Sequence, residues 1–136
     1  MSSKLLVVDD DETTRDLLRE VFAKEGYDVS LAASGEEALK RIRGDRFPLV
    51  VSDIRMLELD GLAVLREAKR SNPSCAVILM TGFGSFEGAI EAVQKGAFDY
   101  VSKPFQIQEI KAVVSRALRQ SEAEEQERKR SAKDRG

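Results

Sequence analysis

Five short apolar runs alternate along the chain with segments whose apolar residues recur at helical spacing. The runs cover residues 4–8, 27–32, 49–52, 76–80 and 99–102, and several are rich in valine and isoleucine. Runs this apolar are typical of strands covered on both faces, as in a parallel sheet. The pattern therefore predicts five buried strands separated by helices.

The first helical segment has a clear stop signal. Leu17, Leu18, Val21 and Phe22 recur at helical spacing, and Gly26 follows where a left-handed terminating residue would sit. This spacing predicts an amphipathic helix between the first two strands.

The second helical segment has a clear start. Ser34 and Glu37 form a capping box, in which each side chain can accept a hydrogen bond from a free backbone amide of the other's turn. Ala38, Leu39 and Ile42 then give an apolar stripe that ends before Gly44. A second helix is therefore predicted before the third strand.

Apolar stripes mark three further helices. They consist of Leu62 and Leu65; of Phe86, Ala89, Ile90 and Val93, closed by Gly96; and of Ile107, Ile110, Val113, Val114, Ala117 and Leu118. Strands and helices that alternate in this way pair in parallel through right-handed crossovers. We predict an α/β fold with a doubly wound, five-stranded parallel sheet in the flavodoxin-like order 2-1-3-4-5, which binds ligands at the carboxyl ends of strands one and three.

The composition changes after residue 120. A chain of 136 residues fits one domain of ordinary size. From 121 to 136 the only apolar residues are Ala123 and Ala132, and most of the others are charged. We predict one domain at 1–120 and, at 121–136, a solvated helical extension, linker or frayed tail that leads to an output domain in a longer natural chain.

Charge and residue types exclude several classes of function. With 22 basic and 24 acidic residues the net charge is -2, which gives no attraction to nucleic acid or to an anionic membrane. The first apolar run is too short for a signal peptide or a membrane span, so we expect a cytoplasmic protein. There is no histidine, and the one cysteine, Cys75, is expected to be a small buried apolar residue. Chemistry must therefore use carboxylates, hydroxyls and amines.

Acidic residues follow two strands that the predicted sheet places side by side. Asp9, Asp10, Asp11 and Glu12 follow the first strand, and Asp53 ends the third. Asp11 and Glu12 suit the capping position and the first turn of the following helix. The remaining three carboxylates would repel one another at one edge of the sheet unless a cation lay among them. A hard divalent ion with oxygen ligands, Mg²⁺ or Mn²⁺, meets that need.

A hydroxyl and an amine are predicted at the same edge. Thr81 follows the fourth strand and Lys103 the fifth. Pro104 restricts the backbone before it, which favours a fixed direction for the Lys103 side chain. Transfer of a phosphoryl group to an aspartate needs this set: a carboxylate attacks, while a metal, an ammonium group and a hydroxyl stabilise charge on the phosphoryl oxygens.

Four segments resemble the signature segments of bacterial response-regulator receiver domains. They are "LLVVDDDETTRDLL", "VVSDIRM", "LMTGFGS" and "DYVSKPF", in the family's order and spacing over about residues 4 to 119. The stretch from "TGFGS" to "KGAFDYVSKPF" is similar to receivers of enhancer-binding transcription activators. The resemblance implies the receiver fold and a phosphorylation switch of a two-component system.

The resemblance also implies a role for individual residues. Asp53 matches the phosphoacceptor, and Asp9 and Asp10 match the acidic pair of the metal site, to which Arg55 would add its backbone carbonyl. Three further residues match the family's switch hydroxyl, its lysine and its switch aromatic, namely Thr81, Lys103 and Tyr100. In the family the bond between lysine and proline is cis, so we expect a cis Lys103–Pro104 bond, although peptide physics alone favours trans.

Several partners follow from the resemblance. A sensor histidine kinase would supply the phosphoryl group, and the receiver would catalyse its own phosphorylation and dephosphorylation without turning over a separate substrate. Members often form homodimers through the fourth helix, fifth strand and fifth helix. No nucleic acid or membrane is expected to bind this domain directly. The sequence departs from the family's pattern at Leu57, where the family usually has proline. The absence of the proline ring, which fixes φ, would free the loop beside the metal.

Other functions remain open on sequence alone. Asp9-x-Asp11 is similar to the nucleophile motif of haloacid-dehalogenase-type phosphatases, although that function would leave Asp53 idle and no cap domain is evident. A flavodoxin-like cofactor module would cradle phosphate after the first strand, where the acidic residues repel it. A third alternative is a relative of the receivers that binds partners and takes no phosphoryl group. The complete set of Asp10, Asp53, Thr81 and Lys103 argues against this alternative.

Overall fold

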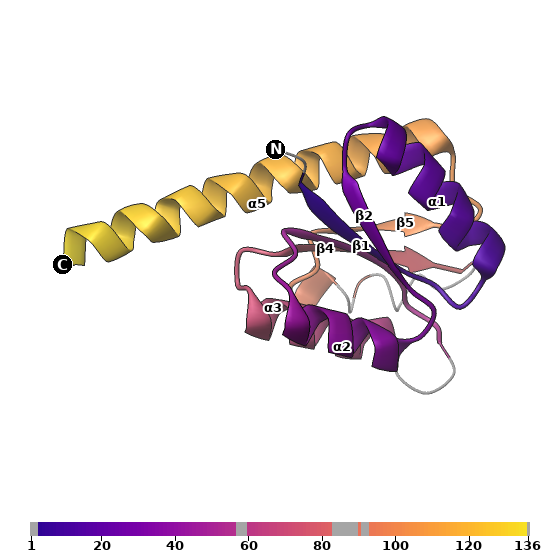
Figure 1. Ribbon diagram of the computed structural model, residues 1–136, viewed down its shortest axis with the longest axis horizontal. Coiled ribbons are helices and arrows are strands. Elements are labelled where there is room, and N and C mark those ends of the chain that lie inside the picture. Colours follow the sequence, from indigo (N-terminus) through magenta and orange to yellow (C-terminus); the bar gives the residue numbers. More distant parts are fainter. Residues whose placement is uncertain (1–2, 57–59, 83–89, 91–92, 136) are drawn as a thin grey trace.

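The computed structural model describes residues 3–56, 60–82, 90 and 93–135 and shows the predicted parallel sheet (Figure 1). Its strands are β1 (Lys4–Val8), β2 (Asp28–Ala32), β3 (Leu49–Asp53), β4 (Ala76–Thr81) and β5 (Asp99–Ser102). They lie in the order β2-β1-β3-β4-β5, and every neighbouring pair is parallel. The predicted fold class and strand order are confirmed.

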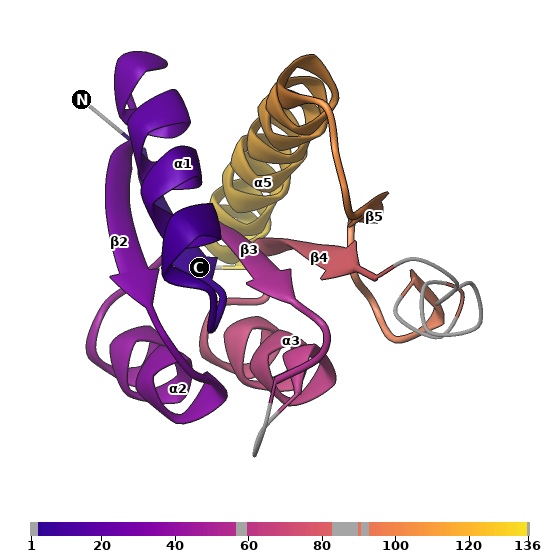
Figure 2. The ribbon, with the colours of Figure 1, turned by 90° about the vertical axis from the view of Figure 1, so that its right-hand side faces the viewer.

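Helices cover both faces of the sheet. α1 (Glu12–Lys24) and α5 (Ile107–Arg135) lie on one face, and α2 (Gly35–Gly44) and α3 (Gly61–Ser71) lie on the other (Figure 2). Phe86 and Ala89 of the predicted fourth helix lie outside the described residues, as does Leu57. The two layers of helices leave the carboxyl ends of the central strands as the open edge of the sheet.

The strands bury alternate side chains in two separate cores. Leu6, Val8 and Val50 pack with α2 and α3, whereas Leu5 and Val7 pack with α1 and α5. Alternation arises because successive side chains on a strand point to opposite faces. Since both faces are covered, these strands are apolar throughout, which explains the continuous runs in the sequence.

The ends of the helices follow the predicted signals. The Asp11 carboxylate caps α1 by accepting from the Thr13 amide, and Gly26 after α1 has a positive φ of 93°. Ser34 caps α2 by accepting from the Glu37 amide. The Glu37 carboxylate accepts from the amide of Ala33, one residue earlier than an ideal capping box. These caps fix where α1 and α2 begin at the open edge of the sheet.

Cys75 is buried at 1% exposure, as predicted, and its burial raises the pKa of the thiol to about 12. At pH 8 roughly one such thiol in ten thousand is ionised, against about one in four for an ordinary thiol. We expect the folded protein to react with a thiol reagent such as DTNB at least about a thousandfold more slowly than the protein in denaturant. Equal rates in the two conditions would contradict the described burial.

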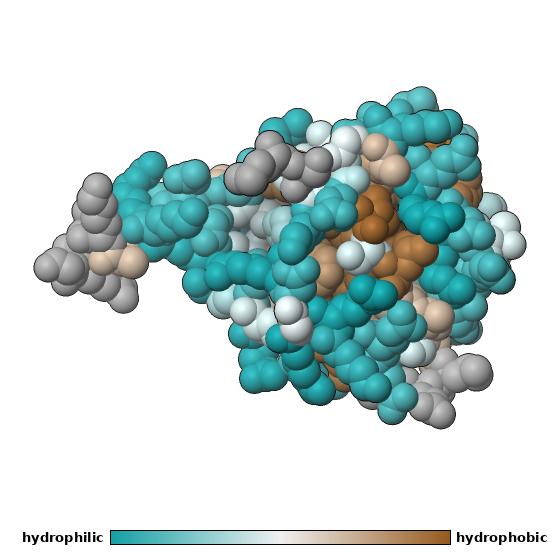
Figure 3. Space-filling view, in the orientation of Figure 1, coloured by the Kyte–Doolittle hydropathy of each residue, from teal (hydrophilic) through white to brown (hydrophobic). Residues whose placement is uncertain are grey.

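α5 continues without a break past residue 120 and projects from the domain (Figure 1). Its first turns beyond that point contact the domain, because Ser121 is 2% exposed and Glu125 accepts from Arg46 Nη2 at 3.0 and 3.2 Å. Arg46 also donates to the Asn72 side chain. In Figure 3 the projecting part of α5 is mostly hydrophilic between the domain and the grey tip. No described helix is long and apolar enough to cross a membrane. The boundary at residue 120 stays a prediction.

The contact between Arg46 and Glu125 is expected to hold the start of the extension on the domain. Arg46→Gln should speed amide exchange of residues 121–126 by up to about fivefold, since a largely exposed ion pair contributes at most about 1 kcal/mol. Arg43→Gln is the matched control, because Arg43 contacts Glu67 of α3 rather than α5. Unchanged exchange in Arg46→Gln, or an equal change in the control, would contradict this role.

Acid should release the same contact. Burial opposes ionisation of Glu125, but the nearby Ser74 hydroxyl and the Arg46 guanidinium outweigh it, so the pKa of Glu125 is lowered. A lowered carboxyl pKa stabilises the folded state at any pH above the ordinary pKa of glutamate. That contribution is lost as the pH falls through the lower pKa that the group has in the folded protein. The protection of the amides of residues 121–126, which is the factor by which they exchange more slowly than those of an unfolded chain at the same pH, should therefore fall below about pH 4.5 in the native protein, and less in Glu125→Gln.

Candidate functional site

Three carboxylates meet at the carboxyl edge of the sheet and form what we call the acid pocket: Asp9, Asp10 and Asp53. Asp9 follows β1 and Asp53 ends β3, and these two strands are neighbours. One oxygen from each carboxylate lies within 4.8 Å of the others. Asp9 is fully buried, Asp53 is 8% exposed, and Asp10 is exposed. The predicted convergence of these residues is confirmed.

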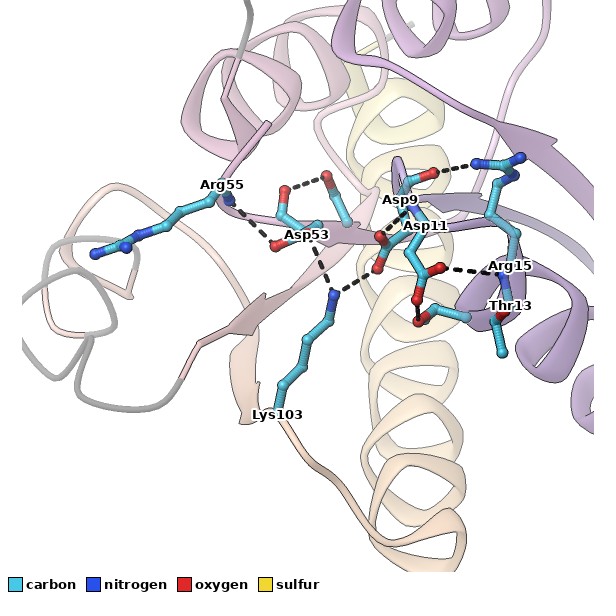
Figure 4. Close-up of polar contacts among 9 residues, drawn as sticks. Asp9, Asp11, Thr13, Arg15, Asp53, Arg55 and Lys103 are labelled. Atoms are coloured by element: carbon cyan, nitrogen blue, oxygen red, sulfur yellow. Dashed lines mark hydrogen bonds and ion pairs between the residues drawn. The ribbon is translucent and has the colours of Figure 1, made fainter. Parts of the chain in front are cut away.

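Lys103 reaches into the acid pocket from the end of β5, as Figure 4 shows (Figure 4). Its Nζ atom lies 2.7 Å from Asp9 Oδ2 and 3.2 Å from Asp53 Oδ2. Its backbone amide donates to the Thr81 carbonyl, and the bond to Pro104 is cis, as expected from the resemblance. The Lys103 side chain therefore points to the edge of the sheet where the carboxylates lie, and its fixed direction stays a prediction.

Burial and charge act against each other in this pair. Burial raises the pKa of Asp9 and outweighs the hydrogen bond from Lys103 that favours the carboxylate. Burial also works against the charged form of Lys103, but the hydrogen bond to Asp9 and the negative charges of Asp53 and Asp9 prevail, so the pKa of Lys103 is raised. The ammonium group is thus held in its charged form beside the carboxylates.

The acid pocket fits a divalent cation. Three carboxylates face one ammonium group, so three negative charges against one positive leave a formal charge of -2 when all are ionised. Converging carboxylate oxygens are the ligands that Mg²⁺ and Mn²⁺ prefer. Asp10 and Asp53 reach the surface, which gives an ion and its remaining waters access.

The other predicted site residues lie around the acid pocket in different ways. Thr81 ends β4 and is 2% exposed, and Tyr100 is half-buried on β5. The Arg55 amide donates to Asp53 Oδ1 at 3.2 Å, while its side chain points away from Asp53 in Figure 4. The roles assigned to the Arg55 carbonyl, the Thr81 hydroxyl and Tyr100 stay predictions.

Two further residues shape the site and were not predicted from sequence. Arg15 Nη1 on α1 donates to the Asp9 carbonyl at 2.8 Å. Gly61, the first residue of α3, donates its amide to Ile54, and a side chain at this position would meet the Asp53 carbonyl. A base near the start of a helix opposes the helix dipole, which is the only signal that could have drawn attention to Arg15.

Known proteins of similar sequence include regulators of transcription. The chain is 43% identical over 114 residues to the transcriptional regulatory protein ZraR of Escherichia coli K12, covering 84% of this chain and 26% of that protein. It is 38% identical over 122 residues to the DNA-binding transcriptional regulator NtrC of the same organism, covering 90% of this chain and 26% of that protein. The chain thus spans about a quarter of the length of these curated relatives.

A solved receiver structure shares the fold. The response regulator receiver domain protein from Clostridium thermocellum superposes with a TM-score of 0.84 at 32% identity, covering 89% of this chain and 98% of that one. The model of the response regulator receiver domain family matches residues 5–115, which include the acid pocket and Lys103. The likeness to receivers of enhancer-binding transcription activators is also confirmed. The chain therefore belongs to the response regulator receiver domain family.

Proposed function

We propose that this receiver accepts a phosphoryl group on Asp53 from a sensor histidine kinase, with Mg²⁺ or Mn²⁺ in the acid pocket. The observation that supports it most directly is the placement of Lys103 Nζ 3.2 Å from Asp53 Oδ2, beside two further carboxylates. A carboxylate, a cation site and an ammonium group at the carboxyl ends of strands of one sheet are the parts that phosphoryl transfer to an aspartate requires.

The chemistry is a displacement at phosphorus. An Asp53 oxygen attacks the phosphorus of a phosphohistidine, so that an O–P bond forms while the P–N bond breaks and the leaving imidazole takes a proton from solvent. The Lys103 ammonium and the Thr81 hydroxyl stabilise charge on the phosphoryl oxygens. A divalent cation held by Asp9, Asp10, Asp53 and the Arg55 carbonyl supplies further charge neutralisation when bound.

The phosphorylated state would then act as a switch. A dianion on Asp53 attracts Thr81 and Lys103. Tyr100 lies on β5, which pairs with the strand that Thr81 ends, and it follows the new arrangement of β5. The changed face of the fourth helix, β5 and α5 would control an output domain, a partner or a second copy of the chain. Ile90 and Val93 of that helix expose 45% and 47% of their surface, which leaves apolar groups for such a contact. A cytoplasmic location also stays a prediction.

Phosphorylation can be tested directly by mass spectrometry after incubation with Mg²⁺ and acetyl phosphate. We expect one phosphoryl adduct on the native protein and none on Asp53→Asn. Asp60→Asn is the matched control: it removes a carboxylate at the start of α3, where asparagine caps as well as aspartate. A native protein without an adduct, beside a positive control receiver, would favour a protein that only binds partners. Turnover of small phosphate esters that depends on Asp9 and not on Asp53 would favour a phosphatase.

Metal binding has its own test. Mg²⁺ should raise the melting temperature because it binds the folded acid pocket and not the unfolded chain. At a hundred times its dissociation constant it should raise the free energy of unfolding by about 2.7 kcal/mol. Asp10→Asn should reduce this rise, because it removes the charge of one carboxylate ligand. Asp10 is exposed, so the packing of the core should not change. An equal Mg²⁺ effect in the variant and the native protein would contradict the assigned metal site.

A further inference from the structure

We propose that Arg15 is a positioning residue for the acid pocket, which holds the turn of Asp9 to Asp11 in the shape that metal binding and phosphorylation require. This inference rests on the proposed function and adds to it a residue from outside the strand ends. The contact that suggests it is the 2.8 Å hydrogen bond from Arg15 Nη1 to the Asp9 carbonyl.

Arg15 binds the turn on both sides of Asp10. Its side chain donates to the Asp9 carbonyl, and its backbone amide donates to the Asp11 carbonyl at 3.1 Å. The turn is also closed from within, because the Asp11 amide donates to Asp9 Oδ1 at 2.9 Å. Arg15 is half-buried, so its side chain is restricted in the number of positions it can take. Figure 4 shows the guanidinium group beside the Asp9 carbonyl (Figure 4).

Asp10 is the residue that depends most on this support. Within the described ranges, its carboxylate has no hydrogen bond or ion pair, whereas Asp9 and Asp53 both contact Lys103. The place of the Asp10 carboxylate near the other two therefore comes from the backbone of the turn. A loosened turn would leave Asp9 and Asp53 held by Lys103 while Asp10 moved away.

Electrostatics and positioning predict opposite effects when Arg15 is neutralised. The positively charged guanidinium donates to the Asp9 carbonyl and to no carboxylate of the acid pocket. If it acted only through that charge, its removal would strengthen the binding of a cation. If it holds the turn, its removal lets the Asp10 carboxylate take several positions and weakens the binding of a cation. The sign of the change in Mg²⁺ affinity therefore separates the two roles.

The test compares Arg15→Gln, Arg15→Lys and the control Arg19→Gln. Arg19 lies one turn further along α1 and contacts the exposed Asp16, so the control removes the same charge without touching the turn. Two readouts are measured: amide exchange of residues 9–12 without metal, and the Mg²⁺ dissociation constant obtained from the dependence of the melting temperature on Mg²⁺ concentration. We expect Arg15→Gln to speed exchange of the Asp11 amide by roughly tenfold and to weaken Mg²⁺ by roughly tenfold.

Each result supports or overturns the inference. Arg15→Lys keeps the charge but lacks the planar fork, so it should also loosen the turn, by less. The positioning role is overturned if the Asp11 amide of Arg15→Gln exchanges at the rate of the native protein. It is also overturned if this variant binds Mg²⁺ as tightly as the native protein or more tightly. Should Arg15→Gln fail to fold, the lysine variant decides by the same two readouts. A native protein that takes no phosphoryl group, while Arg15→Gln still loosens the turn, contradicts the proposed function and leaves the positioning role standing.

Discussion

Gly61→Ala is expected to lower the free energy of unfolding by about 2 to 4 kcal/mol, because the added methyl group has no room. A Cβ atom at this position would lie 2.7 Å from the Asp53 carbonyl oxygen and 2.8 Å from Ile54 Cα. Both atoms belong to the backbone, which cannot rotate away as a flexible side chain can. The first turn of α3 would have to move away from the end of β3, taking the Gly61 amide from its bond to Ile54.

The measurement is chemical denaturation of Gly61→Ala beside Gly44→Ala. Gly44 is the last residue of α2, and a Cβ atom there would meet nothing within 4 Å. Because alanine restricts the unfolded chain, this control should be neutral or more stable by up to about 1 kcal/mol. Phosphorylation of Gly61→Ala should also slow, since the added methyl group would press on the Asp53 carbonyl. Equal stability of the two variants would show that the approach of α3 to β3 is looser than described.

The strands and their order could be predicted because their sequence signals are local and strong. The apolar runs at 4–8 and 99–102 coincide with β1 and β5, and the other three agree with β2, β3 and β4 within one residue. Such runs are explained by burial on both faces, and alternation with helices leaves few sheet orders for five strands. The carboxyl ends of the strands are then fixed, which is why Asp53 and Lys103 could be placed together before their contact was seen.

Some of the remaining contacts could not be predicted because they join residues far apart through flexible side chains. Arg46 and Glu125 are separated by 79 positions, and the composition after residue 120 indicates a solvated segment. Their contact depends on the exact direction of α5, which no local pattern determines. Arg15 presented the opposite difficulty, because its contact is local but a basic residue on a helix surface usually faces solvent. The capping box was predicted, but not that Glu37 would accept from Ala33.

Lys103→Met is expected to lower the free energy of unfolding, measured without divalent metal, by about 3 kcal/mol, the lower end of the range for breaking a buried ion pair. The reason is Asp9, which is fully buried and would lose the ammonium group 2.7 Å away. Methionine preserves the volume of the side chain, so the loss reports on charge rather than on packing. Lys24→Met is the control, since Lys24 is exposed and its ion pair among the described residues is with the exposed Glu20 on its own helix. Its effect should stay within about 0.5 kcal/mol.

Mg²⁺ should act on Lys103→Met in a direction that packing alone cannot explain. Without the ammonium group, the formal charge of the acid pocket changes from -2 to -3, because three carboxylates remain with no base. The cation should therefore bind the variant at least about tenfold more tightly than the native protein and restore part of the lost stability. Phosphorylation of Asp53 should nevertheless slow by about a hundredfold or more, because a metal ion does not replace the positive charge that Lys103 places on the phosphoryl oxygens. A variant that binds Mg²⁺ more weakly than the native protein would contradict the position of Lys103 between Asp9 and Asp53.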